Sequence, residues 1–538
     1  MTLQQWLEVA TDAARRSGLP DLPGLVGTLA AATATLRAAD WNVRADASGT
    51  PPLLATAPLT VPASDSVREG PGTASSDAAL PPPSGRLPDP TGAPHLQPIS
   101  AIANALRDRR LSSRDLAEAC LSEIDRRNPS LNAFITVTSA LARQQADVAD
   151  REIAAGRYRG PLHGIPISLK DLVDLEGVPT TAASRVRAGV LATRDATVVT
   201  RLRDAGAVFV GKCNLHEFAL GTTNEDSAFG PAHHPGFPDR SPGGSSGGSA
   251  VSVVSGMACA SVGTDTGGSI RIPAAACGLV GFKPPFGAVA SDGIVPLSAS
   301  LDHVGPLART VRDATLMFEA MSGRRGSAPA RQAGTLRLGV LRRYFMDVLD
   351  PGVRGVVERA FDRLRSSGAT LVERTIAHAP LTGPVYLHTG LAEAAAYHAV
   401  TLEARAGDYT PPVRVRLELG RLILGEDYAR AQIGRAVLRA EVEAALDEVD
   451  ALLLPTLPIV APPLGASSVD IDGVRESVRN ATLRLTQLFN LTGHPAISLP
   501  AGLVAEGLPV GLQLVGRHAG SADLLAVAEA VEKALQPD

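Results

Sequence analysis

The chain has 538 residues, which is enough for a large hydrophobic core and more than one structural unit. Charged residues make up 20% of the sequence and the formal net charge is −4, so the excess of Lys and Arg that marks a nucleic-acid-binding surface is absent. The sequence has no run of about 20 apolar residues and does not begin with a signal peptide pattern, so we expect no membrane association and a cytoplasmic location.

The first 42 residues are expected to form a helical hairpin. Apolar residues at helical spacing predict a first helix over residues 2–18, through Leu3, Trp6, Leu7, Val9, Ala10 and Ala13. A second helix is expected over residues 22–40, with one side made of Leu25, Leu29, Ala32, Leu36 and Ala39. Two short helices bury too little surface to be stable alone, so the hairpin must pack on the rest of the chain or on a partner.

Residues 43–95 have a different composition. Pro, Ser, Gly, Ala and Thr dominate this stretch, which is typical of an extended linker. Residues 96–538 have the composition of a globular domain. The division into hairpin, linker and globular domain is therefore predicted at about residues 42 and 95.

Helices and short apolar strands alternate through the globular domain. Helices are expected at 101–107, 113–127, 140–155, 197–205, 353–367, 424–449 and 522–535. Strands are expected at 164–174, 208–212, 336–341, 451–455, 496–500 and 510–515. Ser100 is expected to cap the first of these helices, and Ser112 or Ser113 the second. The alternation predicts an α/β fold with a mixed sheet.

The four cysteines are isolated and their neighbours are mostly apolar. None forms a CxxC pair, and no Cys/His cluster has the spacing of metal ligands. We therefore expect free buried thiols in a reducing compartment and no metal site. The residues concerned are Cys120, Cys213, Cys259 and Cys277.

Two Gly/Ser loops enclose an apolar run and are expected to lie inside the core. The first is Ser241-Pro-Gly-Gly-Ser-Ser-Gly-Gly-Ser249, and the second is Gly263-Thr-Asp-Thr-Gly-Gly-Ser-Ile-Arg271. Buried glycine-rich backbone indicates tight turns or the close approach of a ligand to N–H groups. Successive N–H groups before Ser269 suit an oxyanion, and a short helix after it would add positive potential.

Lys170, Ser245 and Ser269 are the residues that local sequence singles out. Lys170 ends an apolar strand, and lysine is rarely buried without a role or a partner. A purely structural alternative is that Lys170 pairs with Asp171 or Asp174. Ser269 is suited to act as a nucleophile or, alternatively, to cap the following helix. No histidine lies in a comparable loop, so a lysine base is favoured over a Ser–His–Asp arrangement.

Three spaced motifs resemble those of the amidase signature family. They are Gly164-Ile-Pro-Ile-Ser-Leu-Lys170-Asp, Ser241-Pro-Gly-Gly-Ser245-Ser-Gly-Gly, and Gly263-Thr-Asp-Thr-Gly-Gly-Ser269-Ile-Arg. The resemblance extends from about residue 98 to the C-terminal end. It implies the amidase signature fold, in which helices cover both faces of a central mixed β-sheet, here preceded by the helical hairpin.

The resemblance also implies a Ser–cisSer–Lys triad that needs no cofactor. Ser269 would be the nucleophile, Lys170 the neutral general base, and Ser245 the bridge between them, with a cis peptide bond after Gly244. The implied oxyanion donors are the backbone N–H groups of Thr266, Gly267, Gly268 and Ser269. The implied supporting residues are Ser246 and an ion pair of Asp265 with Arg271, and substrate-binding residues are expected at Gly221, Thr222 and Thr223.

The implied activity is cleavage of a C–N bond in a small-molecule amide, or of a carbamate, urea or aryl ester, through an acyl-enzyme. Two alternatives stay open: the catalytic component of an amidotransferase complex, and a non-catalytic protein of the same fold. The first is disfavoured because the residues expected to hold a substrate amino group are missing around 393–397. The hairpin loosely resembles the small helical subunit of some family hydrolases. An equal alternative is a dimerisation hairpin, so a homodimer is possible.

Overall fold

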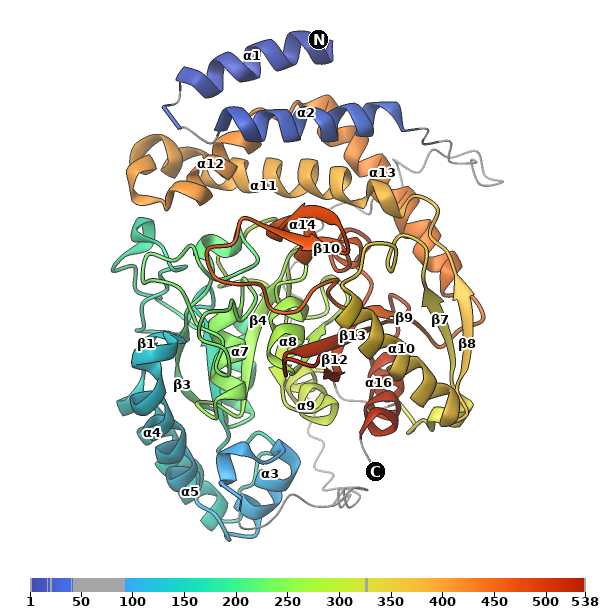
Figure 1. Ribbon diagram of the computed structural model, residues 1–538. Coiled ribbons are helices and arrows are strands. Elements are labelled where there is room, and N and C mark those ends of the chain that lie inside the picture. Colours follow the sequence, from blue (N-terminus) through green and yellow to red (C-terminus); the bar gives the residue numbers. More distant parts are fainter. Residues whose placement is uncertain are drawn as a thin grey trace, which may run out of the picture.

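A computed structural model describes residues 2–16, 18–19, 22–39, 41, 92–324 and 328–536. Its central feature is an eleven-stranded sheet in the order β1-β3-β2-β4-β6-β5-β12-β13-β9-β7-β8. The strands are β1 (Phe134–Val137), β2 (Pro166–Lys170), β3 (Val208–Cys213), β4 (Ala260–Asp265), β5 (Val280–Lys283), β6 (His303–Ala308), β7 (Arg337–Leu341), β8 (Thr370–Arg374), β9 (Ala451–Pro455), β12 (Ala496–Leu503) and β13 (Pro509–Val515). Figure 1 shows this sheet running through the body of the molecule.

The sheet is mixed, as the sequence predicts. β2 pairs in parallel with β3 and β4, and β7 pairs in parallel with β8 and β9. β4 pairs antiparallel with β6, and β12 with β5 and β13. Every residue of β2 is buried, including Ser168 and Lys170, which fits its place between two parallel neighbours. The mixed α/β architecture is thereby confirmed.

Helices flank the sheet on both sides. The helices of the main body are α3 (Ile99–Arg107), α4 (Ser113–Leu131), α5 (Ser139–Ala154), α6 (Thr197–Asp204), α7 (Gly247–Val254), α8 (Arg271–Cys277), α9 (Val311–Ser322), α10 (Pro351–Ser366), α14 (Val478–Leu483), α15 (Leu488–Leu491) and α16 (Ser521–Leu535). Short 3-10 helices lie at Pro94–Leu96, Arg185–Arg187, Glu217–Ala219, Ala333–Thr335, Ala379–Leu381 and Ala406–Asp408. Side chains between the helices and the sheet form the hydrophobic core, which explains the apolar periodicity of both kinds of element.

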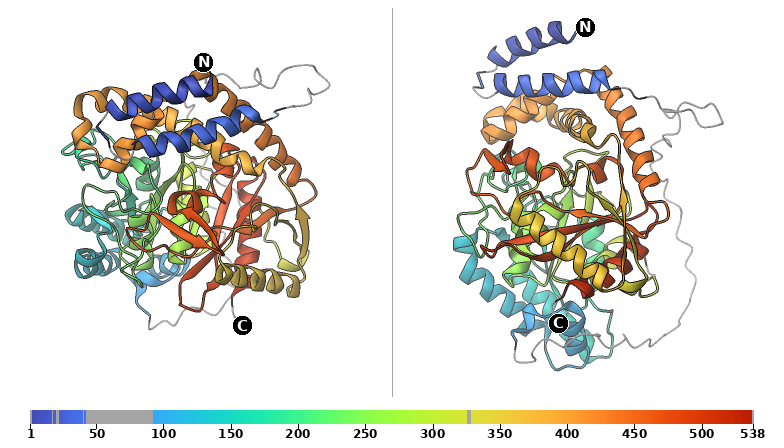
Figure 2. Two further views of the ribbon diagram at one scale, coloured as in Figure 1. Left: turned by 45° about the horizontal axis from the view of Figure 1, so that its top comes forward. Right: turned by 45° about the vertical axis from the view of Figure 1, so that its right-hand side comes forward.

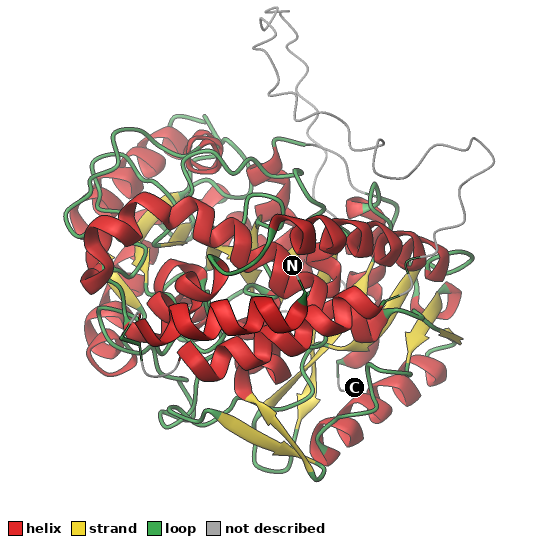
Figure 3. Cartoon of the chain, turned by 90° about the horizontal axis from the view of Figure 1, so that it is seen from above, coloured by secondary structure: helices red, strands yellow, loops and turns green. Residues whose placement is uncertain are grey.

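A separate helical layer lies over one edge of this body. It contains α11 (Thr382–Arg405), α12 (Pro411–Gly420) and α13 (Gly425–Ala445), with the N-terminal helices α1 (Leu3–Arg16) and α2 (Leu22–Ala38) stacked on it. Figures 1 and 2 show α2 lying across these helices with α1 outermost, and Figure 3 looks down on the layer. The N-terminal helices therefore pack on the chain's own body.

Specific polar contacts join the N-terminal helices to this layer. Trp6 Nε1 donates a hydrogen bond to the Leu422 carbonyl at 2.8 Å, and Thr33 Oγ1 lies 2.9 Å from His388 Nε2. Arg37 donates from Nε and Nη2 to the two carboxylate oxygens of Asp427, both at 2.7 Å. These contacts satisfy the polar groups of Trp6, Thr33 and Arg37 at the interface.

The buried residues of these helices coincide only in part with the apolar patterns that predict them. In α1 the buried residues include Trp6 and Ala10, whereas Leu7 and Val9 are exposed, Val9 to 59%. In α2 the buried stripe runs through Val26, Leu29, Thr33 and Leu36. Leu25 and Ala32 are only partly buried because α2 packs between α1 and the α11–α13 layer, which displaces its most buried side.

Other predicted features in this part of the chain have mixed outcomes. Pro98, not Ser100, is the N-cap of α3, and it provides no side-chain cap. Ser112 does cap α4, because its hydroxyl accepts a hydrogen bond from the Asp115 N–H. The predicted linker lies outside the described residues apart from 92–95. No described helix combines the length and the apolar composition needed to cross a lipid bilayer.

A small second sheet forms a feature that the sequence did not predict. Strands β10 (Ser468–Ile471) and β11 (Val474–Ser477) pair antiparallel, and α14 follows directly after β11. In Figure 1 this hairpin and α14 lie between the central sheet and the helical layer. The hairpin therefore places α14 between the central sheet and α11.

Candidate active site

Lys170 is the last residue of the buried strand β2, and its side chain is completely buried. Its ammonium nitrogen Nζ donates to Ser245 Oγ at 2.7 Å and to Thr264 Oγ1 at 2.8 Å. Thr264 lies on β4, the parallel neighbour of β2, so the pairing of these strands brings the two side chains together. The predicted approach of Lys170 to Ser245 is therefore present in the structure.

Burial is the main reason why Lys170 has an unusual pKa. Desolvation lowers the pKa of this amine to about 7, and the negative charges of Asp265 and Asp302 only partly oppose the shift. The neighbouring carboxylate of Asp171 instead forms an ion pair with Lys212 at 2.8 Å. The alternative in which Lys170 pairs with Asp171 is thus wrong, and a neutral amine is accessible near pH 7.

The loop that carries Ser245 leads into helix α7. The peptide bond between Gly244 and Ser245 is cis, as expected. The backbone packs tightly around it, because a Cβ on Gly244 would lie 2.8 Å from the Asn224 nitrogen and 2.9 Å from the Thr223 nitrogen. A Cβ on Gly248 would lie 2.4 Å from the Asn214 carbonyl oxygen. Glycine is required at these positions by the close approach of neighbouring backbone.

Ser269 lies in the turn between β4 and α8 and is only 4% exposed. The backbone N–H of Ser246 donates to the Ser269 carbonyl at 3.3 Å, which ties the two Gly/Ser loops together. Ile270, not Ser269, is the N-cap of α8, and no side chain caps this helix. The capping alternative is therefore wrong. Within the described residues, the Ser269 hydroxyl makes no hydrogen bond and stays available for chemistry.

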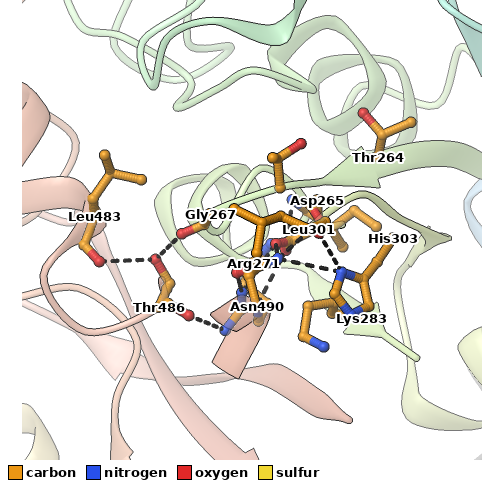
Figure 4. Close-up of polar contacts among 12 residues, drawn as sticks. Thr264, Asp265, Gly267, Arg271, Lys283, Leu301, His303, Leu483, Thr486 and Asn490 are labelled. Carbon is orange, nitrogen blue, oxygen red and sulfur yellow. Dashed lines mark hydrogen bonds and ion pairs between the residues drawn. The ribbon is translucent and has the colours of Figure 1, made fainter. Parts of the chain in front are cut away.

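The backbone before Ser269 has the form expected of an oxyanion site. Within the described part of the chain, the N–H groups of Gly267, Gly268 and Ser269 have no hydrogen-bond partner. The Gly267 carbonyl is held from behind by Thr486 Oγ1, which donates to it at 2.6 Å (Figure 4). Gly268 has a φ of +141°, a conformation that favours glycine. The orientation of this peptide segment is thus fixed while its donors remain free.

Asp265 and Arg271 brace the same turn through a fully buried ion pair. Arg271 Nη2 lies 2.9 Å from Asp265 Oδ1, and Arg271 Nε donates to Oδ2 at 3.0 Å (Figure 4). Asn490 Nδ2 donates to the Asp265 carbonyl and to Oδ1, both at 2.8 Å. Burial by itself would raise the pKa of Asp265, but the charge of Arg271 and its hydrogen bonds lower it below the usual range. The predicted ion pair is present.

Ser246 has a structural position in this arrangement. Its hydroxyl donates to the Thr264 carbonyl at 3.2 Å and accepts from the Thr264 N–H at 3.4 Å. It therefore connects the Ser245 loop to β4, the strand that leads to Ser269. A supporting role for Ser246 agrees with these contacts.

Comparison with known proteins places this geometry in a family. Residues 115–525 match the family model described as Amidase. The chain belongs to the amidase signature family. A crystal structure described as an amidase has 38% sequence identity and a TM-score of 0.78, and the match covers 81% of this chain and 99% of that one. The fold and the recognition of the family from its motifs are confirmed.

Several relatives are named as components of an amidotransferase. The A subunit of glutamyl-tRNA(Gln) amidotransferase from Roseiflexus sp. (strain RS-1) is 39% identical over 477 residues, which cover 82% of this chain and 96% of the relative. Its counterpart from Anaeromyxobacter sp. (strain K) is 41% identical over 473 residues, which cover 80% and 94%. A solved protein from an unexpected vestigial complex that reveals the evolutionary origins of an s-triazine catabolic enzyme is 34% identical, with a TM-score of 0.77 and coverage of 81% and 98%.

Of the predicted substrate-binding residues of this amidase family member, Thr222 and Thr223 pack against the cis bond. A Cβ on Gly244 would lie 2.9 Å from the Thr222 carbonyl carbon. Gly221 lies against the ring of His216, where a Cβ would come within 2.0 Å of Nε2. These residues shape the wall behind Ser245, and their contact with substrate stays a prediction.

Several residues near the site were missed by the sequence interpretation. Thr264 is the second hydrogen-bond partner of Lys170. Thr266 Oγ1 donates to Asp302 at 2.6 Å, and burial raises the pKa of Asp302 to about 6. Tyr386 of α11 approaches the oxyanion segment, since a Cβ on Gly267 would lie 2.4 Å from its hydroxyl. In the sequence these residues differ from others only by carrying a hydroxyl or carboxyl group. Their contacts join residues that are far apart in the sequence, so the pattern of neighbouring residues does not predict them.

A cavity of about 100 Å³ lies beside Thr264 and Thr266, which form part of its wall. Asp302 and His303 also line it, and Leu172, Ile294 and Leu297 contribute apolar surface. Neither Ser245 nor Ser269 lines this space. The cavity is therefore not assigned to the scissile bond of a substrate.

Proposed function

We propose that this amidase family member cleaves the C–N bond of an amide-type substrate through a serine acyl-enzyme. The observation that carries the proposal is the buried Lys170 amine, hydrogen-bonded at 2.7 Å to Ser245 Oγ, with its pKa lowered to about 7. Ser269 is the proposed nucleophile because its loop is tied to that of Ser245 and its hydroxyl is free among the described residues. A lysine poised near neutrality is matched to general-base work at pH 7.

In the proposed first step, neutral Lys170 takes the proton of the Ser245 hydroxyl as Ser245 takes the proton of Ser269. The Ser269 oxygen forms a bond to the carbonyl carbon, and the carbonyl π electrons move to its oxygen. The free N–H groups of Thr266, Gly267, Gly268 and Ser269 stabilise that charge. The tetrahedral intermediate then breaks its C–N bond, and the departing nitrogen receives a proton from Lys170 through the same hydroxyl.

Hydrolysis requires water to attack the resulting ester by the reverse relay, which restores the Ser269 hydroxyl. The substrate range proposed from the serine chemistry is amides, with carbamates, ureas or aryl esters as further possibilities. A test panel contains small aliphatic amides, aryl amides, carbamates and carboxylated ureas. We expect turnover of at least one class and its loss in Ser269→Ala. Covalent labelling of Ser269 by a fluorophosphonate probe gives a second readout, and absence of both turnover and labelling contradicts the proposal.

A second candidate function is catalysis within an amidotransferase complex. The observation that favours it is the 39–41% identity to curated amidotransferase components over about four fifths of the chain. Both functions share the proposed acyl-enzyme. They differ in whether the nitrogen released from the substrate is lost to solvent or transferred to a second substrate. Native mass measurement and affinity purification from the source cell separate them, because an obligate large partner is expected only for the amidotransferase.

The proposed base predicts a specific pH dependence. Lys170 acts in its neutral form, so kcat/KM should rise with pH and level off above about 7, the lowered pKa of this amine. Below the midpoint the activity should fall about tenfold per pH unit. Thr264→Val removes an acceptor that stabilises the protonated amine, and it should move the midpoint to lower pH. A pH–rate profile checks both; a profile flat from about pH 5 to 9 contradicts the assignment.

We also propose the division of the chain into a hairpin at 1–42, a linker at 43–95 and a catalytic domain at 96–538. The hairpin's packing on α11–α13 supports its role as a built-in helical subunit. A homodimer formed through the hairpin remains a prediction, and the native mass decides it. The contacts of Trp6, Thr33 and Arg37 within one chain favour the built-in arrangement.

Arg37→Ala should loosen the hairpin. The change removes both hydrogen bonds to Asp427, a carboxylate that is only 3% exposed, and hydrogen bonds to charged groups contribute about 1.5–3 kcal/mol. We expect amide hydrogen exchange in α2 to accelerate, as measured by mass spectrometry. Arg15→Ala, at an exposed position of α1, is the control. Equal protection of α2 in the two variants contradicts the role given to this pair.

A further inference from the structure

Arg479 lies on the same face of α14 as a residue that touches the oxyanion segment. Leu483 is four positions further along the helix, and residues at that spacing are neighbours, about 5–6 Å apart at Cβ. A Cβ on Gly267 would lie 3.0 Å from Leu483 Cδ2. Figure 4 shows Leu483 on the side of the network where Thr486 holds Gly267. Arg479 therefore lies one helical turn away from the contact between α14 and the proposed oxyanion site.

The guanidinium of Arg479 has no partner within the described chain. It makes neither a hydrogen bond nor an ion pair, although arginines before and after it do. Arg475 donates to Ser468 Oγ at 3.2 Å, and Arg484 donates to the Tyr344 carbonyl at 3.2 Å. Arg479 is partly exposed, so its guanidinium is neither satisfied by protein nor sealed from solvent.

Arg416 is the charged side chain that acts most on Arg479. Burial is the main cause that lowers its pKa, to about 10, and the charge of Arg416 lowers it further. Arg416, on α12, donates to the Leu220 carbonyl at 3.2 Å and lies 3.5 Å from Asp226. Asp226 also lies 3.0 Å from His216 Nε2, so its charge is shared. Arg479 thus has a partly buried positive charge without a dedicated counter-ion among the described residues, and a bound anion would stabilise such a charge.

We infer that Arg479 binds a carboxylate of the substrate, so that the preferred substrates carry a free carboxylate near the scissile amide. A guanidinium matches a carboxylate by paired hydrogen bonds, which provides orientation as well as affinity. Leu483 of α14 and Tyr386 of α11 both approach Gly267. Burial raises the pKa of Tyr386 to about 12 and the charge of Arg479 opposes that shift, so Arg479 lies near the phenol that borders the oxyanion segment. The inference rests on the proposed acyl-enzyme function and specifies its substrate class.

The test compares two primary amides with the same four-carbon chain, succinamic acid, which ends in a carboxylate, and butyramide, which ends in a methyl group. Wild type should have the higher kcat/KM for succinamic acid. Arg479→Gln should lower that kcat/KM about 10- to 100-fold, the loss expected for a charge-assisted hydrogen bond, and change the value for butyramide less than about threefold. Arg475→Gln is the matched control, since Arg475 is exposed on β11 and pairs within its own hairpin.

Binding to the Ser269→Ala variant, measured by calorimetry, separates this inference from the proposed function. Tighter binding of succinamic acid than of butyramide, lost in Ser269→Ala/Arg479→Gln, supports the inference even if wild type turns over neither amide. Turnover without a preference for the carboxylated amide overturns the inference and leaves the proposed function intact. An equal loss for both amides in Arg479→Gln also overturns it, because the residue would then be only structural.

Discussion

Replacement of Lys170 by methionine is expected to lower kcat about 10³-fold without unfolding the protein. General-base catalysis contributes about 10²- to 10⁴-fold, and the change removes the base while conserving most of the side-chain volume. Lys170 is completely buried and bonded to Ser245 and Thr264, so no solvent molecule replaces it easily. Steady-state kinetics on the best substrate, with circular dichroism to confirm folding, measure the effect.

The same variant should differ from wild type in stability in a pH-dependent way. Folding lowers the pKa of Lys170 from 10.5 to about 7, so burial of this amine destabilises wild type most below pH 7. That destabilisation diminishes as pH rises from about 7 towards 10.5, where the unfolded chain also loses the proton. Lys170→Met should therefore be more stable than wild type at about pH 6, by an amount that shrinks at about pH 9. Urea unfolding at both pH values measures the difference.

Ser255→Ala is a suitable control for these experiments. Ser255 is buried near the end of α7, and its hydroxyl has no hydrogen-bond partner among the described residues. Its removal should leave kcat within about twofold of wild type. Full turnover by Lys170→Met, or an equal loss in Ser255→Ala, would exclude Lys170 as the base.

Replacement of Arg271 by methionine is expected to cause the largest loss of stability, about 3–5 kcal/mol, because it leaves the buried carboxylate of Asp265 without its ion-pair partner. Arg271 also donates to the Thr486 carbonyl at 3.0 Å and to Asn490 Oδ1 at 2.6 Å, so these acceptors lose a partner as well. Urea unfolding at about pH 7 provides the measurement, with activity expected to fall in parallel as the Ser269 turn loosens.

The double variant Asp265→Asn/Arg271→Met tests whether the unpaired charge of Asp265 causes the loss of stability. Removal of both charges abolishes the uncompensated carboxylate, so the double variant should be more stable than Arg271→Met alone. If the double variant loses the sum of the two single effects, packing around Arg271 and not the buried charge explains the destabilisation. A loss below about 1 kcal/mol for Arg271→Met would show that the pair is not important for stability.

The sequence was sufficient to predict the residues whose chemistry conflicts with their surroundings. Lys170 was recognisable because a lysine ends an apolar strand, and Ser245 and Ser269 because glycine-rich loops flank apolar segments. The mixed sheet followed from the alternation of helices and strands. The motif spacing added the family and, with it, the cis bond before Ser245.

The remaining features depend on which elements become neighbours. Thr264 meets Lys170 only because β2 pairs with β4, and the sequence separation of 94 residues gives no indication of that pairing. Leu7 and Val9 belong to the apolar pattern that predicts the first helix, yet they are exposed, because an apolar residue in a helix does not reveal whether a neighbour covers it. The position of Arg479 one helical turn from Leu483, which contacts Gly267, likewise depends on where α14 packs. Contacts of this kind are tertiary, and local propensity does not encode them.

All four cysteines are inaccessible in the folded chain. Thiol-directed dyes should therefore react slowly with the native protein, and no cysteine needs to be removed before site-specific labelling. A cysteine introduced in place of the exposed Val9 would carry a fluorophore on the outermost helix. Such a reporter, read by emission anisotropy, would follow release of the N-terminal segment in real time during turnover or mixing with candidate partners.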